Sequence, residues 1–199
     1  MAVWLKTDER EETVSSLMMV RDASGNIIND TFQWKWIVIA LHNALQGFMV
    51  SSLRNGNNFR VMPEKLASKC YEAHRANKPW PKERLDSFPN LYKKVKSDEY
   101  MKFFIHSKSL PETENNDGCI NKLIELRNKF IHFVPQGWSL EVSGLPYICL
   151  TVLEMIRFLG WKSGNIFWHN VGLKDQAERI LNECEDNFRK IKAVYESNS

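Results

Sequence analysis

The stretch WKWIVIALHNALQGF, from Trp34 to Phe48, decides the fold class of this chain. Asp30 and Thr31 precede it, and side chains of this kind cap the starts of helices, which predicts a helix over residues 31–53. Its hydrophobic positions cover almost the whole circumference, whereas a surface helix would have one apolar stripe. We therefore expect this helix in the centre of a helical bundle.

Further helical patterns follow along the chain, separated by short breaks such as Asn77-Lys-Pro-Trp-Pro. The clearest have a continuous apolar stripe at helical spacing, two begin at a proline, which suits the first turn of a helix, and the stretch over residues 89–105 is less regular. With no repeat and no long linker, the chain is predicted to be a single all-α domain of five or six helices, residues 1–199. The predicted segments start near residues 63, 89, 119, 146 and 173.

Residues 1–30 form an N-terminal extension for which the pattern leaves two structures open. Residues 9–21 could form a short helix that ends before Asp22. They could equally form a hairpin with residues 26–28, because Ser-Gly-Asn is a strong turn signal.

The charge of the chain is unevenly distributed, although the formal net charge is only +3. Residues 65–108 contain eleven Lys or Arg against five Asp or Glu. Such a segment could contact phosphates or form a solvated surface. Lys93, Lys94 and Lys96 are expected to be exposed, and they are candidates to follow an RNA backbone.

The cysteines predict neither a metal site nor a disulfide framework. No pair has C-x-x-C spacing and none lies beside a histidine, so neither zinc nor any other metal or cofactor is predicted. Buried thiols in a reducing compartment are expected instead. The four cysteines are Cys70, Cys119, Cys149 and Cys184.

No feature of the chain predicts export or a membrane span. The first residues lack an apolar signal region. The best membrane candidate, from Leu145 to Trp161, is short and contains Glu154 and Arg157, which indicates a buried core helix. We therefore expect a cytoplasmic protein with no membrane partner.

The helix predicted from Cys119 to Val134 places a charge where a hydrophobic residue is expected. At 100° per residue, seven apolar side chains between Leu123 and Val134 form one arc, and Arg127 falls near its middle. A buried guanidinium needs acceptors or a wet cavity, so this position is a candidate functional site. Asn128 and His132 lie four residues apart beside the arc, which predicts a shared helical face.

An arginine, an amide and an imidazole on one helix suit chemistry at a phosphodiester. The imidazole can transfer protons near neutral pH, and the guanidinium can stabilise charge that develops on phosphate oxygens. The amide can orient either group. RNA supplies its own nucleophile, the 2′-hydroxyl, so no metal is required.

The segment LIELRNKFIHF, from Leu123 to Phe133, resembles the HEPN superfamily, whose hallmark is an Arg, often followed by Asn, with a His four to six residues further on. The helix over residues 34–48 looks like the opening core helix of this superfamily. Its polar residues His42, Asn43 and Gln46 are candidates for a supporting shell, or they hydrogen-bond within the bundle.

The resemblance implies a metal-independent endoribonuclease with Arg127, Asn128 and His132 as catalytic residues. It implies a homodimer with a composite cleft, a role in toxin–antitoxin or phage-defence systems, and an antitoxin or regulatory partner. Cleavage would leave a 2′,3′-cyclic phosphate and a 5′-hydroxyl. Some HEPN proteins lack nuclease activity, so the alternative is a catalytically silent module that binds protein or nucleotide. A sequence-specific DNA binder ranks lower, because no helix-turn-helix signature is present.

Overall fold

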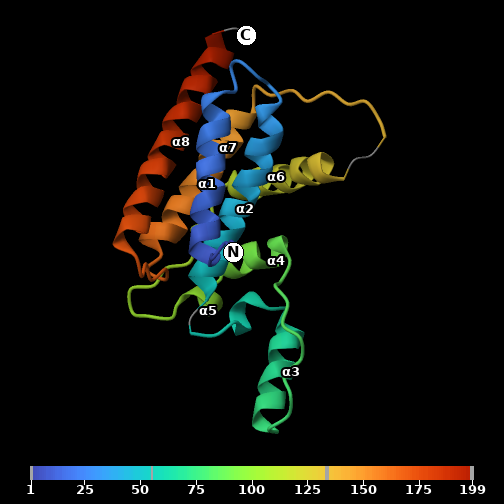
Figure 1. Ribbon diagram of the computed structural model, residues 1–199, viewed down its shortest axis with the longest axis vertical. Coiled ribbons are helices and arrows are strands. Elements are labelled where there is room, and N and C mark those ends of the chain that lie inside the picture. Colours follow the sequence, from blue (N-terminus) through green and yellow to red (C-terminus); the bar gives the residue numbers. More distant parts are fainter. Residues whose placement is uncertain (1, 55, 133–134, 198–199) are drawn as a thin grey trace. The chain divides into compact units, whose positions relative to one another are not determined.

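The computed structural model describes residues 2–54, 56–132 and 135–197, and it confirms an all-α fold, since every regular element in these ranges is helical (Figure 1). The described residues contain eight α-helices, compared with the five or six expected. A 3-10 turn at Phe59–Val61 and a π-helical turn at Phe158–Lys162 complete the regular structure. The helices are α1 Glu9–Gly25, α2 Gln33–Leu53, α3 Glu64–Arg75, α4 Phe88–Lys96, α5 Asp98–Met101, α6 Asn116–Ile131, α7 Leu145–Arg157 and α8 Val171–Ser197.

One reason for the higher count lies in the stretch predicted over residues 89–105. Ser97 has an extended backbone, with φ −93° and ψ 128°, and it separates α4 from the four-residue α5. The N-terminal segment adds another helix, because α1 is continuous over residues 9–25 and the hairpin alternative is wrong. Asp8 starts α1 by accepting hydrogen bonds from the backbone amides of Arg10 and Glu11.

The chain divides into two compact units. Unit 1 comprises Met1–Gly47, Glu112–Arg157 and Phe167–Ser199, and unit 2 comprises Phe48–Pro111 and Phe158–Ile166. Helix α2 contributes its residues up to Gly47 to unit 1 and the remainder to unit 2. The single domain expected from the sequence stays a prediction.

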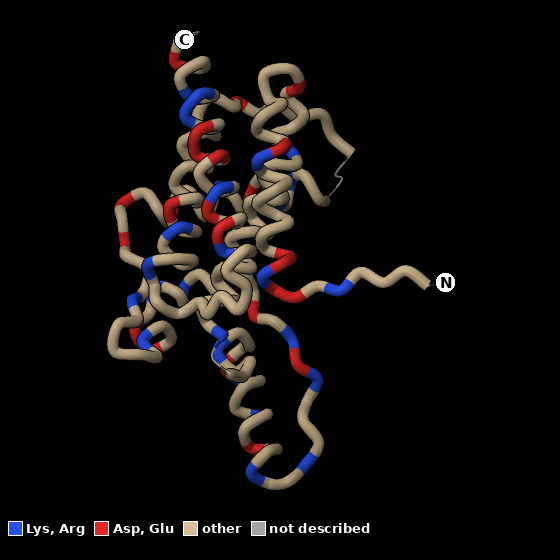
Figure 2. Tube along the Cα trace, turned by 60° about the vertical axis from the view of Figure 1, so that its left-hand side comes forward, with Lys and Arg blue, Asp and Glu red and all other residues tan. Residues whose placement is uncertain are grey.

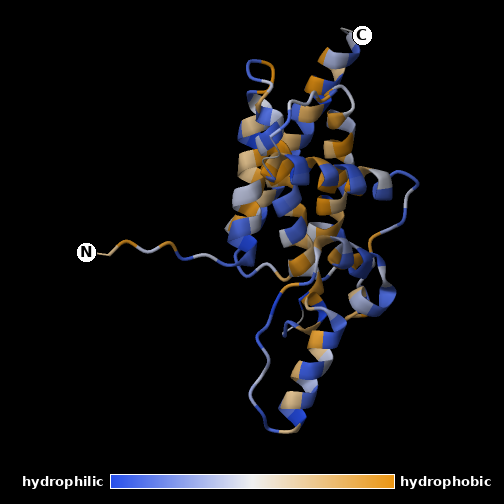
Figure 3. Ribbon diagram, turned by 90° about the vertical axis from the view of Figure 1, so that its right-hand side faces the viewer, coloured by the Kyte–Doolittle hydropathy of each residue, from blue (hydrophilic) through white to orange (hydrophobic). Residues whose placement is uncertain are grey.

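Unit 1 is built around α1, α7 and α8, which run side by side (Figure 1). The Asn187 side chain on α8 donates to Ser24 Oγ of α1 at 3.0 Å, and Arg21 pairs with Glu183 at 3.5 Å. Helix α2 adds the buried Trp34, whose indole N–H donates to the Tyr195 hydroxyl at 3.2 Å. Residues 2–8 precede α1 in an extended, exposed segment (Figure 3).

Unit 2 contains α3, α4, α5, the end of α2 and the π-helical turn. Phe48 lies 5.8 Å from Trp161, measured between ring centroids, and Gly160 leaves the space that the Phe48 ring fills. Asn165 ties the later segment to α5 by donating to the Met101 carbonyl at 2.7 Å. Positive charges are frequent along α3 and the segment that follows it (Figure 2).

Helix α2 is the one helix of the described residues that is long and apolar enough to cross a membrane. Two thirds (67%) of its most apolar window is buried inside the protein, as in the core helix that the sequence predicts. The other candidate, Leu145–Trp161, is mostly buried in α7 and the turn after it. The four cysteines are free thiols, and the prediction that they are buried is confirmed.

Candidate functional site

Helix α6 holds two of the three predicted catalytic residues in its last turns. Leu123 and Leu126 anchor the helix, with only 1% of each exposed. The helix was predicted to reach Val134, but its last residue is Ile131, while Phe133 and Val134 lie outside the described residues. Pro135 has no amide hydrogen to donate to the carbonyl of Ile131, which favours this early end.

Arg127 is half-buried on α6, next to the hydrophobic positions that the helical wheel placed around it. Its Nη1 donates to the side-chain oxygen of Asn128 at 3.2 Å. Its Nε is buried without a hydrogen-bond partner, and no carboxylate of the described residues forms an ion pair with it. The guanidinium therefore keeps unused capacity to bind an anion.

His42, on α2, is the buried neighbour that responds to this charge. Only 5% of its surface is exposed, and burial lowers the pKa of His42 to about 4, with a further lowering by the charge of Arg127. A hydrogen bond with the exposed Asn43 opposes this shift in part. The imidazole is consequently neutral at pH 7, so it can lie near the Arg127 guanidinium without charge repulsion. Gln46, one turn later, is half-buried.

Among the described residues, His132 makes no side-chain contact of this kind with Arg127 or His42. It is exposed, and its backbone has left the helix, with φ −90° and ψ 88°. Its backbone N–H donates to the carbonyl of Asn128 at 2.9 Å. Across the described ranges its imidazole forms no hydrogen bond or ion pair with Arg127 or Asn128. The backbone N–H of His132 still forms a helical hydrogen bond to Asn128, and the predicted shared face of the Asn128 and His132 side chains stays a prediction.

An aromatic groove of about 560 Å³ adjoins the end of α6, and the sequence reasoning missed it. Phe130 and Trp138 form one wall, with ring centroids 5.2 Å apart, and Phe32 before α2 is 81% exposed. Lys129 lies 5.9 Å from the Trp138 ring, and Lys35 also lines the groove. On the helical wheel Phe130 belongs to the apolar arc, which predicts a core position. The aromatic and basic residues near it in the sequence were the only signal for an open groove.

In unit 1, the predicted site residues His42, Asn43, Arg127 and Asn128 lie together. His132 lies at the adjoining end of α6. Exposed aromatic rings beside lysines are the combination that stacks bases and attracts a phosphate backbone. Within residues 2–54, 56–132 and 135–197, no three His, Cys, Asp or Glu side chains gather as metal ligands would. The site thus offers a cation, amides and imidazoles as its chemical groups.

Comparisons with protein-family models, with curated proteins and with solved structures find no match to this chain. The resemblance to the HEPN superfamily accordingly rests on Arg127, Asn128 and His132 and on their place at the end of a helix in an all-α chain.

Proposed function

We propose that this chain is a metal-independent endoribonuclease of the HEPN type. The observation that carries the proposal is the half-buried Arg127, which has no carboxylate partner among the described residues and lies close enough to His42 to lower its pKa. A half-buried guanidinium without an acid partner keeps N–H donors that a phosphate could accept from. The aromatic groove beside α6 supplies a surface for the bases of a single strand.

In the proposed reaction, the 2′-oxygen of a ribose attacks the adjacent phosphorus while the bond from phosphorus to the 5′-oxygen breaks. One group removes the proton of the 2′-hydroxyl, and another gives a proton to the departing 5′-oxygen. Arg127 stabilises the charge on the phosphate oxygens, and Asn128 orients Arg127 through their hydrogen bond. The products are a 2′,3′-cyclic phosphate and a 5′-hydroxyl.

His132 is the group proposed to transfer protons, and its exposure suits a site completed by a second chain. One subunit supplies one such imidazole, whereas the reaction needs a base and an acid. A homodimer with a composite cleft would supply both. The proposal places this enzyme in the cytoplasm, in a toxin–antitoxin or phage-defence system under the control of an antitoxin or regulatory partner.

The test incubates purified protein with mixed tRNA and mRNA in excess EDTA, beside His132→Ala of matched circular dichroism. The control is His169→Ala, which removes another exposed histidine of unit 1. We expect cleavage with cyclic-phosphate ends from wild type and from the control, but not from His132→Ala. Equal cleavage by His132→Ala would overturn the catalytic assignment.

One observation favours a second candidate function, a catalytically silent binding module. The His132 imidazole has no side-chain contact that would hold it toward Arg127 among the described residues. In a silent module the aromatic groove would bind a partner and Arg127 would anchor it. A folded, dimeric wild type that cuts no RNA, with or without cell extract, would favour this candidate.

A further inference from the structure

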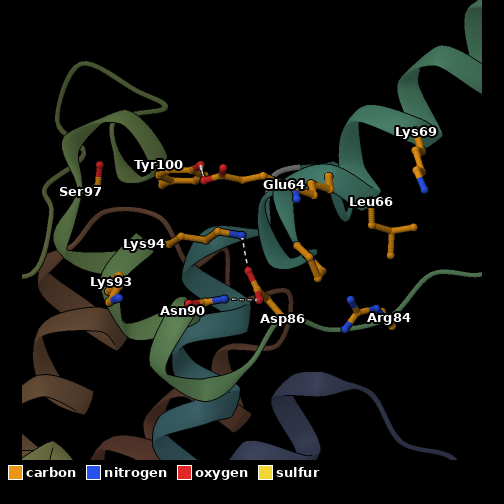
Figure 4. A pocket seen from close by; sticks show the side chains of 12 residues that line it. Glu64, Leu66, Lys69, Arg84, Asp86, Asn90, Lys93, Lys94, Ser97 and Tyr100 are labelled. Atoms are coloured by element: carbon orange, nitrogen blue, oxygen red, sulfur yellow. Dashed lines mark hydrogen bonds and ion pairs between the residues drawn. The ribbon is translucent and has the colours of Figure 1, made fainter.

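Unit 2 contains a cavity of about 810 Å³ that the proposed nuclease site does not use. Its walls come from the start of α3, the segment that precedes α4, and helices α4 and α5 (Figure 4). Five of its lining side chains are cations and two are carboxylates, a net charge of +3. This volume is within the range of small-molecule sites. Which class of ligand could bind depends on how the charges are arranged.

The base of the cavity is a neutral ion pair. Lys94 Nζ lies 2.8 Å from Asp86 Oδ2 and donates to the Met62 carbonyl at 2.6 Å. Asn90 and the backbone amide of Ser87 both donate to Asp86 Oδ1 at 2.8 Å. Burial raises the pKa of Asp86, but Lys94 and these two donors together outweigh it, so the pKa is lowered. Only 6% of Lys94 is exposed, so the prediction that it is exposed is wrong.

The second carboxylate, Glu64, is engaged by Tyr100. The Tyr100 hydroxyl donates to Glu64 Oε1 at 2.5 Å, and this hydrogen bond raises the pKa of Tyr100 to about 12. The hydroxyl therefore keeps its proton at neutral pH and continues to hold the carboxylate. Neither carboxylate of the cavity forms an ion pair with the remaining cations in the described residues.

Four exposed cations surround this base: Lys65, Lys69, Arg84 and Lys93. In Figure 4, Lys69 extends from α3 toward the segment that carries Arg84, and Lys93 lies on the other side of the ion pair. None of the four pairs with a carboxylate in the part of the chain that the structure describes. Holding like charges around one cavity is unfavourable unless an anion occupies it.

We propose that this cavity binds phosphate groups of a polyanionic ligand, either the phosphodiester strand of RNA or a free polyphosphate. Lysine is a common phosphate ligand, and three lysines with one arginine match a ligand that has several negative charges. The site stands on unit 2 alone. Its phosphate binding needs no catalysis by His132, so either proposal can fail without the other.

The test uses full-length protein that carries His132→Ala, so that RNA survives the measurement. The cavity variant adds Lys65→Gln, Lys69→Gln, Arg84→Gln and Lys93→Gln. The control variant instead adds Arg75→Gln, Lys78→Gln, Lys82→Gln and Lys108→Gln, which change the charge equally at exposed positions of unit 2 outside the cavity. Binding of inorganic tripolyphosphate and of single-stranded RNA is titrated at several salt concentrations, with circular dichroism matched.

We expect the cavity variant to lose affinity for at least one probe by about tenfold or more, while the control variant keeps it. If RNA is the ligand, the slope of log affinity against log salt falls by about 3, because four phosphate contacts are lost at about 0.7 each. Loss for tripolyphosphate alone assigns the site to a free polyphosphate. Equal losses in both variants, or no binding of either probe to the parent protein, would overturn the proposal.

Discussion

Unit 2 contains the buried cation Lys94 and unit 1 the half-buried cation Arg127, and the two differ in how they are paired. Lys94 in unit 2 forms an ion pair with Asp86 and donates to the Met62 carbonyl. Arg127 in unit 1 has a buried Nε without a partner and only an amide oxygen on Nη1, among the described residues. The contrast separates a cation that holds the fold together from one that remains available to a ligand.

The largest expected effect comes from removing the paired cation, Lys94. Lys94→Met leaves Asp86 buried, charged and uncompensated, so we expect the free energy of unfolding to fall by about 3–5 kcal/mol. Chemical denaturation followed by circular dichroism measures this loss. The neighbouring exposed lysine gives the control, since Lys93→Met should change stability by less than about 0.5 kcal/mol. Equal effects of the two substitutions would contradict the contrast.

Removing the available cation should affect activity and leave stability nearly unchanged. Arg127→Met deletes a charge without an acid partner, so unfolding should change by no more than about 1 kcal/mol. Under the proposed function, RNA cleavage should fall by about 10²–10³-fold, because stabilisation of the phosphate charge is lost. Lys122→Met on the same helix, which removes a partner of Glu125, should cleave normally. A large stability loss with normal cleavage would make Arg127 structural.

The pH dependence of stability sharpens the account of unit 1. The pKa of His42 is about 4 in the folded protein and 6.5 as its ordinary value. Stability from the neutral imidazole is therefore complete above pH 6.5 and is lost as pH falls toward 4, by about 3 kcal/mol. Unfolding measured between pH 4 and 8 should show this slope in wild type and in His169→Ala. A slope unchanged in His42→Phe would rule out His42 as its source.

The smallest expected effects are losses of stability when one glycine of each unit is replaced by alanine. A Cβ at Gly47 would overlap with Thr13 of α1, whereas a Cβ at Gly160 would approach Phe48 Cε1 to 2.9 Å. We expect Gly47→Ala to cost about 1–3 kcal/mol and Gly160→Ala to cost less, because the overlap with Thr13 is the closer of the two contacts. Thermal unfolding of the two variants tests this order. Restored stability in Gly47→Ala combined with Thr13→Ala would identify the overlap as the cause.

Much of the helical architecture could be predicted from local patterns. The start and end of α2, the stripe of α8 and the buried cysteines follow from capping residues and from spacing. The number of helices was underestimated, because the extended backbone of Ser97 has no strong signal in the sequence. Local patterns left a helix and a hairpin open for residues 9–21. Helix α1 packs against α8, which is distant in the sequence.

The candidate sites were less predictable than the helices. The periodicity identified Arg127 as an unusual residue, but it could not show that α6 ends at Ile131 or that the His132 imidazole makes no hydrogen bond to Arg127 or Asn128 in the described residues. The cavity around Lys94 was missed, because an exposed and a buried lysine look alike in a basic segment.

Local sequence patterns were enough to predict the all-α class, most helix positions and the unusual charge in α6, since hydrophobic spacing and capping act over a few residues. Which cations are neutralised depends on the packing of distant segments. Lys94 meets the carbonyl of Met62, thirty-two residues away, and Arg127 lowers the pKa of His42 on another helix. Burial and pairing of charge depend on side chains brought together from distant segments, and local patterns do not contain that information.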